Sequence, residues 1–251
     1  MYKKVIVILG GSVDPSFVKE VLDDAGKPFI IAADKGLEVL YKLSVMPDII
    51  LGDFDSVDNS ILEEYKSEIL TRFSPVKDFT DGEAAVDKAI EVVLSWGSQD
   101  DDQEDIQKNG HVNVQNNDRV NVQDESDIPE SSVVILGATG SRLDHVLANI
   151  SLLKKAVDAG VRAEIVDRNN KIRIFNNFDS IKVFKNNGKK YLSLMPLGDK
   201  VTGLTLSGFK YGVTDADLYQ GSSLAISNEI TSDYGMISFK DGYLIVMETD
   251  D

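Results

Sequence analysis

Four segments of the chain place acidic side chains directly or shortly after a run of apolar residues. They read IIAADKG around Asp34, ILGDFDS around Asp53 and Asp55, VKDFTD around Asp81, and LGATGSRLDH around Arg142. Carboxylate oxygens are the ligands that hard cations such as Mg²⁺ prefer, and several carboxylates close together repel one another unless a cation binds between them. If the fold brings these segments together, the sequence predicts a magnesium site suited to polyphosphate chemistry.

The last of these segments also has the composition of a phosphate-binding turn. Residues 137–142 are rich in glycine and precede an expected helix, so that backbone N–H groups at the helix N-terminus would face a phosphate. Another glycine pair, Gly10-Gly11, follows the first apolar run. No GxxxxGK[ST] motif is present, so the sequence does not support Walker-type nucleotide binding.

Alternating strand and helix patterns from the N-terminus to about residue 167 predict the elements that position these segments. Helical periodicity covers residues 15–25, 81–96 and 143–159. Apolar runs expected to form buried strands lie at residues 5–9, 29–33, 48–51, 69–73, 133–137 and 163–166. The alternation predicts an α/β fold with a mainly parallel sheet between helices. The carboxyl ends of parallel strands share one edge, so we expect the acidic segments to converge there.

Helix capping is a simpler interpretation for some of these polar residues. Thr80 stands three residues before Glu83, and Ser141 three residues before Asp144, which is the spacing of a capping box. Asp14 precedes a proline at an expected helix start, and we expect it to act only as a cap. The functional interpretation therefore depends on the combination of segments at four strand ends.

From about residue 170 to residue 251 the helical period disappears. Short alternating runs, separated by turns such as Asn186-Asn187-Gly188 and Asp241-Gly242, are typical of a small all-β sandwich. These runs lie at residues 171–175, 181–184, 191–195, 201–206, 216–219, 223–227, 235–239 and 243–247. The sequence thus predicts an α/β domain over residues 1–167 and a β-sandwich domain over residues 168–251.

Composition limits the chemistry and the partners of the chain. It has 251 residues, no cysteine and two histidines, which excludes disulfides, thiolate zinc sites and a cysteine nucleophile. A net charge of -16 argues against nucleic acid as a partner, because phosphate neutralisation needs Lys and Arg. The first apolar run, residues 5–9, is too short for a signal peptide or a membrane span. We therefore expect a soluble, cytoplasmic protein without a membrane partner.

Half of the net charge lies in one segment. Residues 98–131 contain ten acidic and two basic residues, a net charge of -8, and no aromatic residue. A segment of this composition buries too little apolar area to offset the entropy of ordering it. The sequence predicts a flexible acidic insertion, with a partner-binding role as the alternative.

The motifs together resemble the thiamine pyrophosphokinase (thiamine diphosphokinase) family. ADKG, PDIILGDFDS, KDFTD, LGATGSRLDHVLANI and GSSLAISNE occur in the order of the family signatures. The likeness covers nearly the whole chain apart from residues 98–131. It implies Mg²⁺-dependent transfer of a pyrophosphoryl group from ATP to thiamine, giving thiamine diphosphate and AMP. It also implies a homodimer with active sites at the subunit interface.

The resemblance implies roles for individual residues, and it assigns four acidic residues to metal binding. The residues that match magnesium-associated positions are Asp34, Asp53, Asp55 and Asp81. Three of these, Asp53, Asp55 and Asp81, are also expected to be catalytic together with Arg142. Asp55 or Asp81 could accept the proton of the thiamine hydroxyl.

Other matches concern the two substrates. The residues expected at the nucleotide, in addition to Asp34, are Lys77, Asp78, Thr80, Gly140, Arg142 and Asp144. Ser227, Asn228 and Asp55 are expected to contact thiamine, the first two from the partner subunit.

Two other functions remain open from the sequence. ILGDFDSV fits the strand-then-DxDx[TV] pattern of haloacid-dehalogenase-like phosphohydrolases, with Asp53 as nucleophile, although that pattern is expected on the first strand. A non-catalytic thiamine or nucleotide sensor is the second alternative. It is motivated by Lys35, Gly82 and Ala225, which depart from the family pattern.

Overall fold

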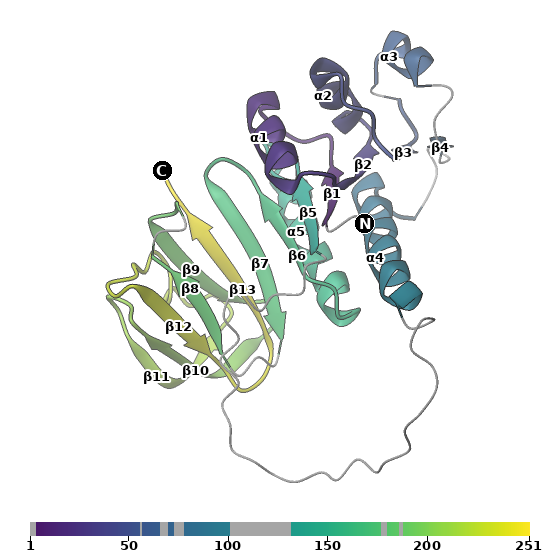
Figure 1. The fold of residues 1–251 in the computed structure, drawn as a ribbon. Helices are drawn as coiled ribbons and strands as arrows, with labels where there is room; N and C mark the ends of the chain where they lie inside the picture. Colours follow the sequence, from purple (N-terminus) through teal and green to yellow (C-terminus); the bar gives the residue numbers. More distant parts are fainter. Residues whose placement is uncertain are drawn as a thin grey trace.

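A computed structural model describes residues 4–55, 57–65, 70–72, 78–100, 132–176, 180–185 and 188–251 (Figure 1). Most of the predicted acidic insertion, residues 101–131, lies outside these described residues, as does Lys77. The predicted start of the insertion at residue 98 is wrong, because helix α4 continues to Asp100. No proline stands between Trp96 and Asp100 to break its hydrogen bonds.

One nine-stranded sheet crosses the molecule. Its first six strands are parallel, in the order β4 (Leu70–Arg72), β3 (Ile49–Gly52), β2 (Phe29–Ala33), β1 (Lys4–Ile8), β5 (Ser132–Leu136) and β6 (Ala163–Val166). The sheet continues with three antiparallel strands, β7 (Asn170–Asn176), β13 (Tyr243–Thr249) and β9 (Tyr191–Pro196). The predicted fold class, an α/β region with a mainly parallel sheet, is confirmed.

Helices cover both faces of the parallel part of this sheet (Figure 1). Strand β1 explains the arrangement: Val5 and Val7 face one core and Ile6 and Ile8 the other, so a strand buried on both sides is apolar throughout. Helices α4 (Asp81–Asp100) and α5 (Leu143–Asp158) pack on the first face. The second face carries α1 (Pro15–Ala25), α2 (Gly36–Leu43) and α3 (Asn59–Glu64).

A second, antiparallel sheet packs against the C-terminal strands of the first. Its order is β11 (Val213–Tyr219), β10 (Lys200–Ser207), β12 (Tyr234–Ser238) and β8 (Ile181–Phe184). A core that includes Leu194 of β9, Val246 of β13 and Leu204 of β10 fills the space between the sheets. The C-terminal region is therefore a sandwich, one layer of which belongs to the same sheet as the parallel strands.

Three details of the predicted elements are wrong. Helices α2 and α3 were not expected, because with eight and six residues they are too short to show a clear helical period. Residues 223–227, expected as a strand, form a loop between β11 and β12. The apolar pattern of this loop has a packing cause, since Ala225 is 1% exposed in the sandwich core and its carbonyl accepts from the Leu194 N–H at 2.8 Å.

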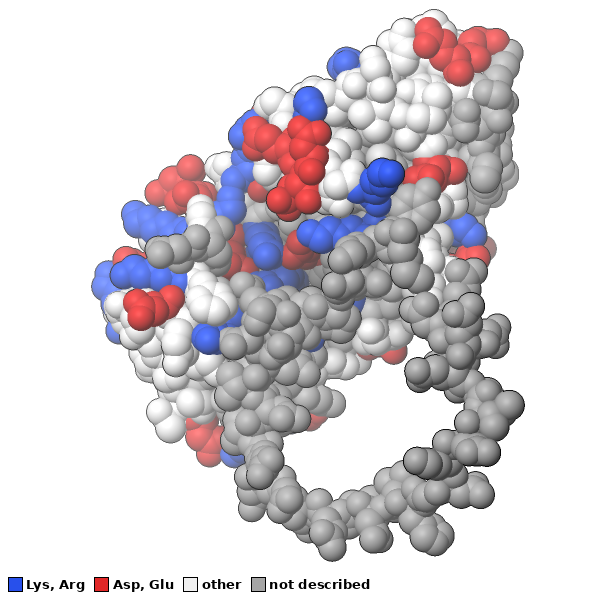
Figure 2. Space-filling view, in the orientation of Figure 1, with Lys and Arg blue, Asp and Glu red and all other residues white. Residues whose placement is uncertain are grey.

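Opposite charges lie side by side on the surface. Figure 2 shows acidic and basic side chains interspersed across the face drawn there. Some opposite charges on the surface form ion pairs, such as Lys19–Asp23 at 2.8 Å. None of the helices in the described part of the chain has both the length and the apolar character that crossing a membrane requires.

Candidate active site

A cleft of ≈520 Å³ opens at the carboxyl ends of the parallel strands. The strand order reverses between β1 and β5, since β2 to β4 extend to one side of β1 while β5 and β6 lie on the other. Open α/β sheets bind ligands at such a switch point. The cleft is lined by residues 9–12 after β1, 33–35 after β2, 80–82 at the start of α4, 137–142 after β5, and 145, 146 and 149 of α5.

The turn after β2 directs Asp34 toward the neighbouring strand end. Asp34 has a left-handed backbone conformation, with φ of 46°, and its N–H donates to the Leu51 carbonyl at 3.2 Å. A Cβ on Gly52 would lie 2.2 Å from Asp34 Oδ1, and Gly52 itself has φ of 148°. Only glycine leaves room for the Asp34 carboxylate here. The G of the GDFDS motif thus makes space for the D of ADKG.

Three carboxylates converge at this position. One oxygen each from Asp34, Asp53 and Asp81 lies within 4.8 Å of the other two. Asp34 Oδ1 is buried and has no hydrogen-bond partner among the described residues. Neighbouring ligands of an octahedral Mg²⁺ are roughly 3.0 Å apart and opposite ligands roughly 4.2 Å, so the three oxygens would have to draw closer together for coordination. The donor set and the unpartnered buried oxygen fit a hard divalent cation.

The electrostatics of this group also favour a cation. Burial, the nearby charge of Asp81, a hydrogen bond with the Asp81 carboxyl and the charge of Asp53 together raise the pKa of Asp34 to about 7. Its ordinary pKa is 3.8. Between these values the folded chain keeps a proton that the unfolded chain has released, so without metal the stability contributed by Asp34 falls as pH rises to about 7.

We expect Mg²⁺ binding to strengthen as the pH rises through this range. The ion must displace the proton of Asp34, so its affinity should fall about tenfold for each pH unit below 7. Calorimetric titration of the nucleotide-free protein with Mg²⁺ at pH 6, 7 and 8 measures this. Asp23→Asn, in an exposed pair with Lys19, should behave as wild type, and equal affinities at pH 6 and pH 8 would contradict the expectation.

The two glycine-containing loops on the other side of the cleft hold each other. The Gly11 N–H donates to the Gly137 carbonyl and the Ser12 N–H to the Thr139 carbonyl, both at 2.9 Å. A Cβ on Gly11 would lie 2.2 Å from the Gly137 oxygen, so no larger residue fits without moving the backbone. Asn149 completes the contact by donating to the Ala138 carbonyl at 2.8 Å. The loops after β1 and β5 therefore form one unit at the switch point.

Arg142 is the basic side chain at this unit, and Asp144 binds it. The guanidinium donates to both carboxylate oxygens, at 3.2 Å from Nε and 2.5 Å from Nη2. This contact lowers the pKa of Asp144, chiefly through the hydrogen bond from Arg142. Both side chains are exposed, so the pair contributes little to stability, and a phosphate entering the cleft could replace Asp144 as the partner of Arg142.

The structure distributes the predicted site residues unevenly. Those that line the cleft are Asp34, Thr80, Asp81, Gly140 and Arg142. Asp53 joins through the carboxylate group, while Asp55 is exposed and outside that group, its N–H donating to Asp53 Oδ1 at 3.2 Å. Thr80 also caps α4, since its Oγ1 accepts from the Glu83 N–H at 3.1 Å. Asp78 is exposed and is not among the lining residues.

Several lining residues were not predicted as site residues. Gly10, Gly11 and Ser12 were set aside because they lack the Walker pattern, and Asn149 was expected only on a helix. His145 is exposed and also lines the cleft. The sequence did offer one signal for the role of Gly10-Gly11, because the pair directly follows the first predicted strand.

Two of the three residues expected at thiamine, Ser227 and Asn228, lie in the sandwich, in the loop before β12. Ser227 is exposed, has φ of 56° and donates its N–H to Ser193 Oγ at 2.9 Å. Asn228 is 2% exposed, and its amide group bonds to both the N–H and the carbonyl of Tyr211. Asn228 thus shapes the loop, and neither residue lines the cleft. Their contact with thiamine stays a prediction.

Comparisons with known proteins agree with this geometry. The model of the thiamin pyrophosphokinase catalytic domain matches residues 24–165, and that of the thiamin pyrophosphokinase vitamin B1 binding domain matches residues 180–244. A thiamine pyrophosphokinase from Bacillus subtilis (strain 168) is 31% identical over 225 residues, which cover 88% of this chain and 87% of the relative.

Solved structures extend the agreement to the fold. A crystal structure of thiamine pyrophosphokinase from Bacillus subtilis superposes with a TM-score of 0.71 at 26% identity and covers 99% of both chains. The yeast thiamin pyrophosphokinase structure, 16% identical, shares the fold with a TM-score of 0.71 over 98% of this chain and 86% of its own. By its sequence over most of its length, the chain belongs to the thiamine pyrophosphokinase family.

Proposed function

We propose that the chain is a thiamine diphosphokinase that transfers a pyrophosphoryl group from ATP to the hydroxyl group of thiamine, releasing AMP. The observation that carries the proposal is the convergence of Asp34, Asp53 and Asp81 beside a glycine turn at the switch point of the sheet, in a chain of this family. A metal-binding group and a phosphate-binding turn on one cleft suit transfer of a charged polyphosphate.

Acidic and basic groups of the cleft would have different roles in the reaction. Asp34, Asp53 and Asp81 would hold Mg²⁺, which supplies positive charge for the phosphate oxygens. Backbone N–H groups around Gly140 and the Arg142 guanidinium would bind the phosphate groups of the nucleotide from the other side. Asp55, exposed beside this group, and Asp81 remain the candidates for accepting the proton of the thiamine hydroxyl.

We further propose a homodimer in which the sandwich of one subunit completes the cleft of the other. Among the described residues, those that line the cleft belong to positions 9–149, whereas Ser227 lies in the sandwich. Exposed apolar side chains occur on both parts: Leu143 and Leu147 of α5 are 72% and 67% exposed, and Leu224 beside Ser227 is 51% exposed. Apolar surface of this kind is typical of contacts between subunits.

The alternatives from the sequence gain no support. Asp53 follows β3 rather than the first strand, and it shares its position with two other carboxylates. Lys35 has an ordinary helical φ of -58°, so it does not strain the turn, and Ala225 belongs to the core. We keep an enzyme as the proposal, with the cytoplasm as its predicted location.

The proposal is tested by incubating the protein with thiamine, ATP and Mg²⁺ and separating the nucleotide products. We expect AMP and thiamine diphosphate in equal amounts, because the pyrophosphoryl group moves as one unit. ADP with thiamine monophosphate would identify a different transfer, and ADP with inorganic phosphate but no phosphorylated thiamine would revive the phosphohydrolase. Thiamine binding without any AMP would support the sensor. A reaction without ATP and one with excess chelator are the controls.

A further inference from the structure

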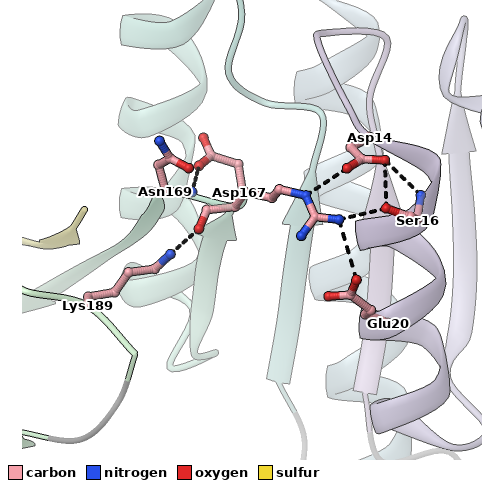
Figure 3. A network of polar contacts seen from close by, with 7 residues as sticks. Asp14, Ser16, Glu20, Asp167, Asn169 and Lys189 are labelled. Carbon is pink, nitrogen blue, oxygen red and sulfur yellow. Dashed lines mark hydrogen bonds and ion pairs between the residues drawn. The ribbon is translucent and has the colours of Figure 1, made fainter. Parts of the chain in front are cut away.

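The turn between β6 and β7, residues 167–169, contacts both glycine-containing loops of the cleft without lining the cleft itself. Neither Asp167 nor Arg168 belongs to the motifs that pointed to the family. Figure 3 shows the turn facing Asp14, Ser16 and Glu20 of the α1 region, with Lys189 on its other side. Its acidic side chain, Asp167, and its basic side chain, Arg168, bind different loops of the cleft.

Asp167 holds the loop after β5. Thr139, which lines the cleft, donates its hydroxyl to Asp167 Oδ2 at 2.8 Å. The carboxylate is fixed in turn, because Oδ1 accepts from the N–H groups of Asn169 and Asn170 at 2.8 and 2.7 Å and from the Asn170 side chain at 2.9 Å. A carboxylate with this many local donors is a rigid support for the Thr139 hydroxyl.

Arg168 holds the loop after β1. Its Nε donates to Asp14 Oδ2 at 2.7 Å, and its Nη2 donates to Ser16 Oγ at 2.6 Å. Asp14 is the N-cap of α1 and ends the Gly10–Asp14 loop that lines the cleft at its other end. The Arg168 carbonyl accepts from Lys189 in the sandwich region, which ties the turn to the C-terminal sheets.

The exposure of the Arg168–Asp14 ion pair favours a positioning role over a stabilising one. The Arg168 and Asp14 side chains are 47% and 45% exposed, and an ion pair of this exposure is screened by solvent and contributes little to folding. The pair adds little to the stability of the fold. The loops that it and Asp167 fix would lie against the phosphates, where a small displacement of donors weakens binding.

We propose that Asp167 and Arg168 are positioning residues for the nucleotide phosphates, acting through Thr139 and Asp14 on the two loops that meet at the switch point. The inference rests on the proposed function for the identity of the ligand, an adenine nucleotide polyphosphate with Mg²⁺. The contacts themselves come from a turn outside the catalytic motifs. Through them the same turn binds both Thr139 and Asp14, which are far apart in the sequence.

The test compares Asp167→Ala and Arg168→Ala with Asp23→Ala, which removes an exposed ion pair from the same helix α1. Loss of one or two hydrogen bonds should raise KM for ATP and the calorimetric Kd of a non-hydrolysable ATP analogue with Mg²⁺ about 3- to 10-fold. KM for thiamine and the melting temperature should stay near wild type. Arg168→Lys should recover part of the loss, and Asp23→Ala should show none.

A double-mutant cycle with Thr139→Val tests whether Asp167 acts through that hydroxyl. We expect the two effects on the analogue Kd to be non-additive, because each substitution breaks the same bond. An unchanged Kd in Asp167→Ala and Arg168→Ala, or equal losses for ATP and thiamine, would overturn the proposal. If wild type binds the analogue but forms no AMP, the proposed function fails while the positioning test still stands.

Discussion

Asp81→Asn is expected to lower kcat/KM by about 10²–10³-fold while making the metal-free protein more stable. The substitution keeps the shape of the side chain but removes one of the three charges that would hold Mg²⁺. It also removes the charge that, after burial, contributes most to the raised pKa of Asp34. Relief of that repulsion should add about 1 kcal/mol to the free energy of unfolding at pH 8, a figure discounted for partial exposure.

The opposite signs of the two effects make the prediction specific. If Asp81 merely supported the fold, its substitution would lower the activity and the stability of the protein together. Steady-state assays and thermal melts without Mg²⁺ measure the two effects, and Mg²⁺ should stabilise wild type more than the variant. Asp23→Asn serves as the matched control, since it removes a carboxylate from an exposed pair on α1. Undiminished activity in Asp81→Asn would exclude the carboxylate group from catalysis.

The carboxylate group was predictable because it depends on sheet geometry. Each of the three residues follows a predicted strand, and the ends of parallel strands share an edge whatever their exact bounds. Asp55 shows the limit of this argument. It lies two residues from Asp53, yet Phe54 between them has φ of 59°, and this turn leaves Asp55 outside the group. A local backbone conformation, unlike the alternation of strands, leaves no periodic signal.

The same reasoning explains what was missed in the sandwich. Residues 223–227 alternate like a strand because Ala225 packs into the core from a loop, and period alone does not separate these cases. The pairing of β7 with β6 is also invisible to composition, since it joins strands on the two sides of the predicted boundary at residue 167. Contacts such as Thr139–Asp167 depend on that pairing, so they could not be predicted without the structure.

Mixing two inactive variants is expected to restore about a quarter of the wild-type activity if the active site is shared between subunits. Asp81→Asn damages the cleft. Ser227→Lys places a positive charge in the exposed loop expected to face thiamine, whose thiazolium ring is also positive. A heterodimer of the two has one site with both defects and one with neither. Random exchange of subunits would make about half of the dimers heterodimers, each with one working site of two.

The matched control is a mixture of Asp81→Asn with Asp53→Asn, in which both defects belong to the cleft. No heterodimer of this pair contains an intact cleft, so activity should stay at the level of the separate variants. Exchange of subunits is followed independently with differently labelled chains. If labelled chains exchange and the first mixture still shows no recovery, Ser227 acts within its own subunit or not at all. Recovery in the first mixture alone would place thiamine between the cleft of one chain and the sandwich of the other.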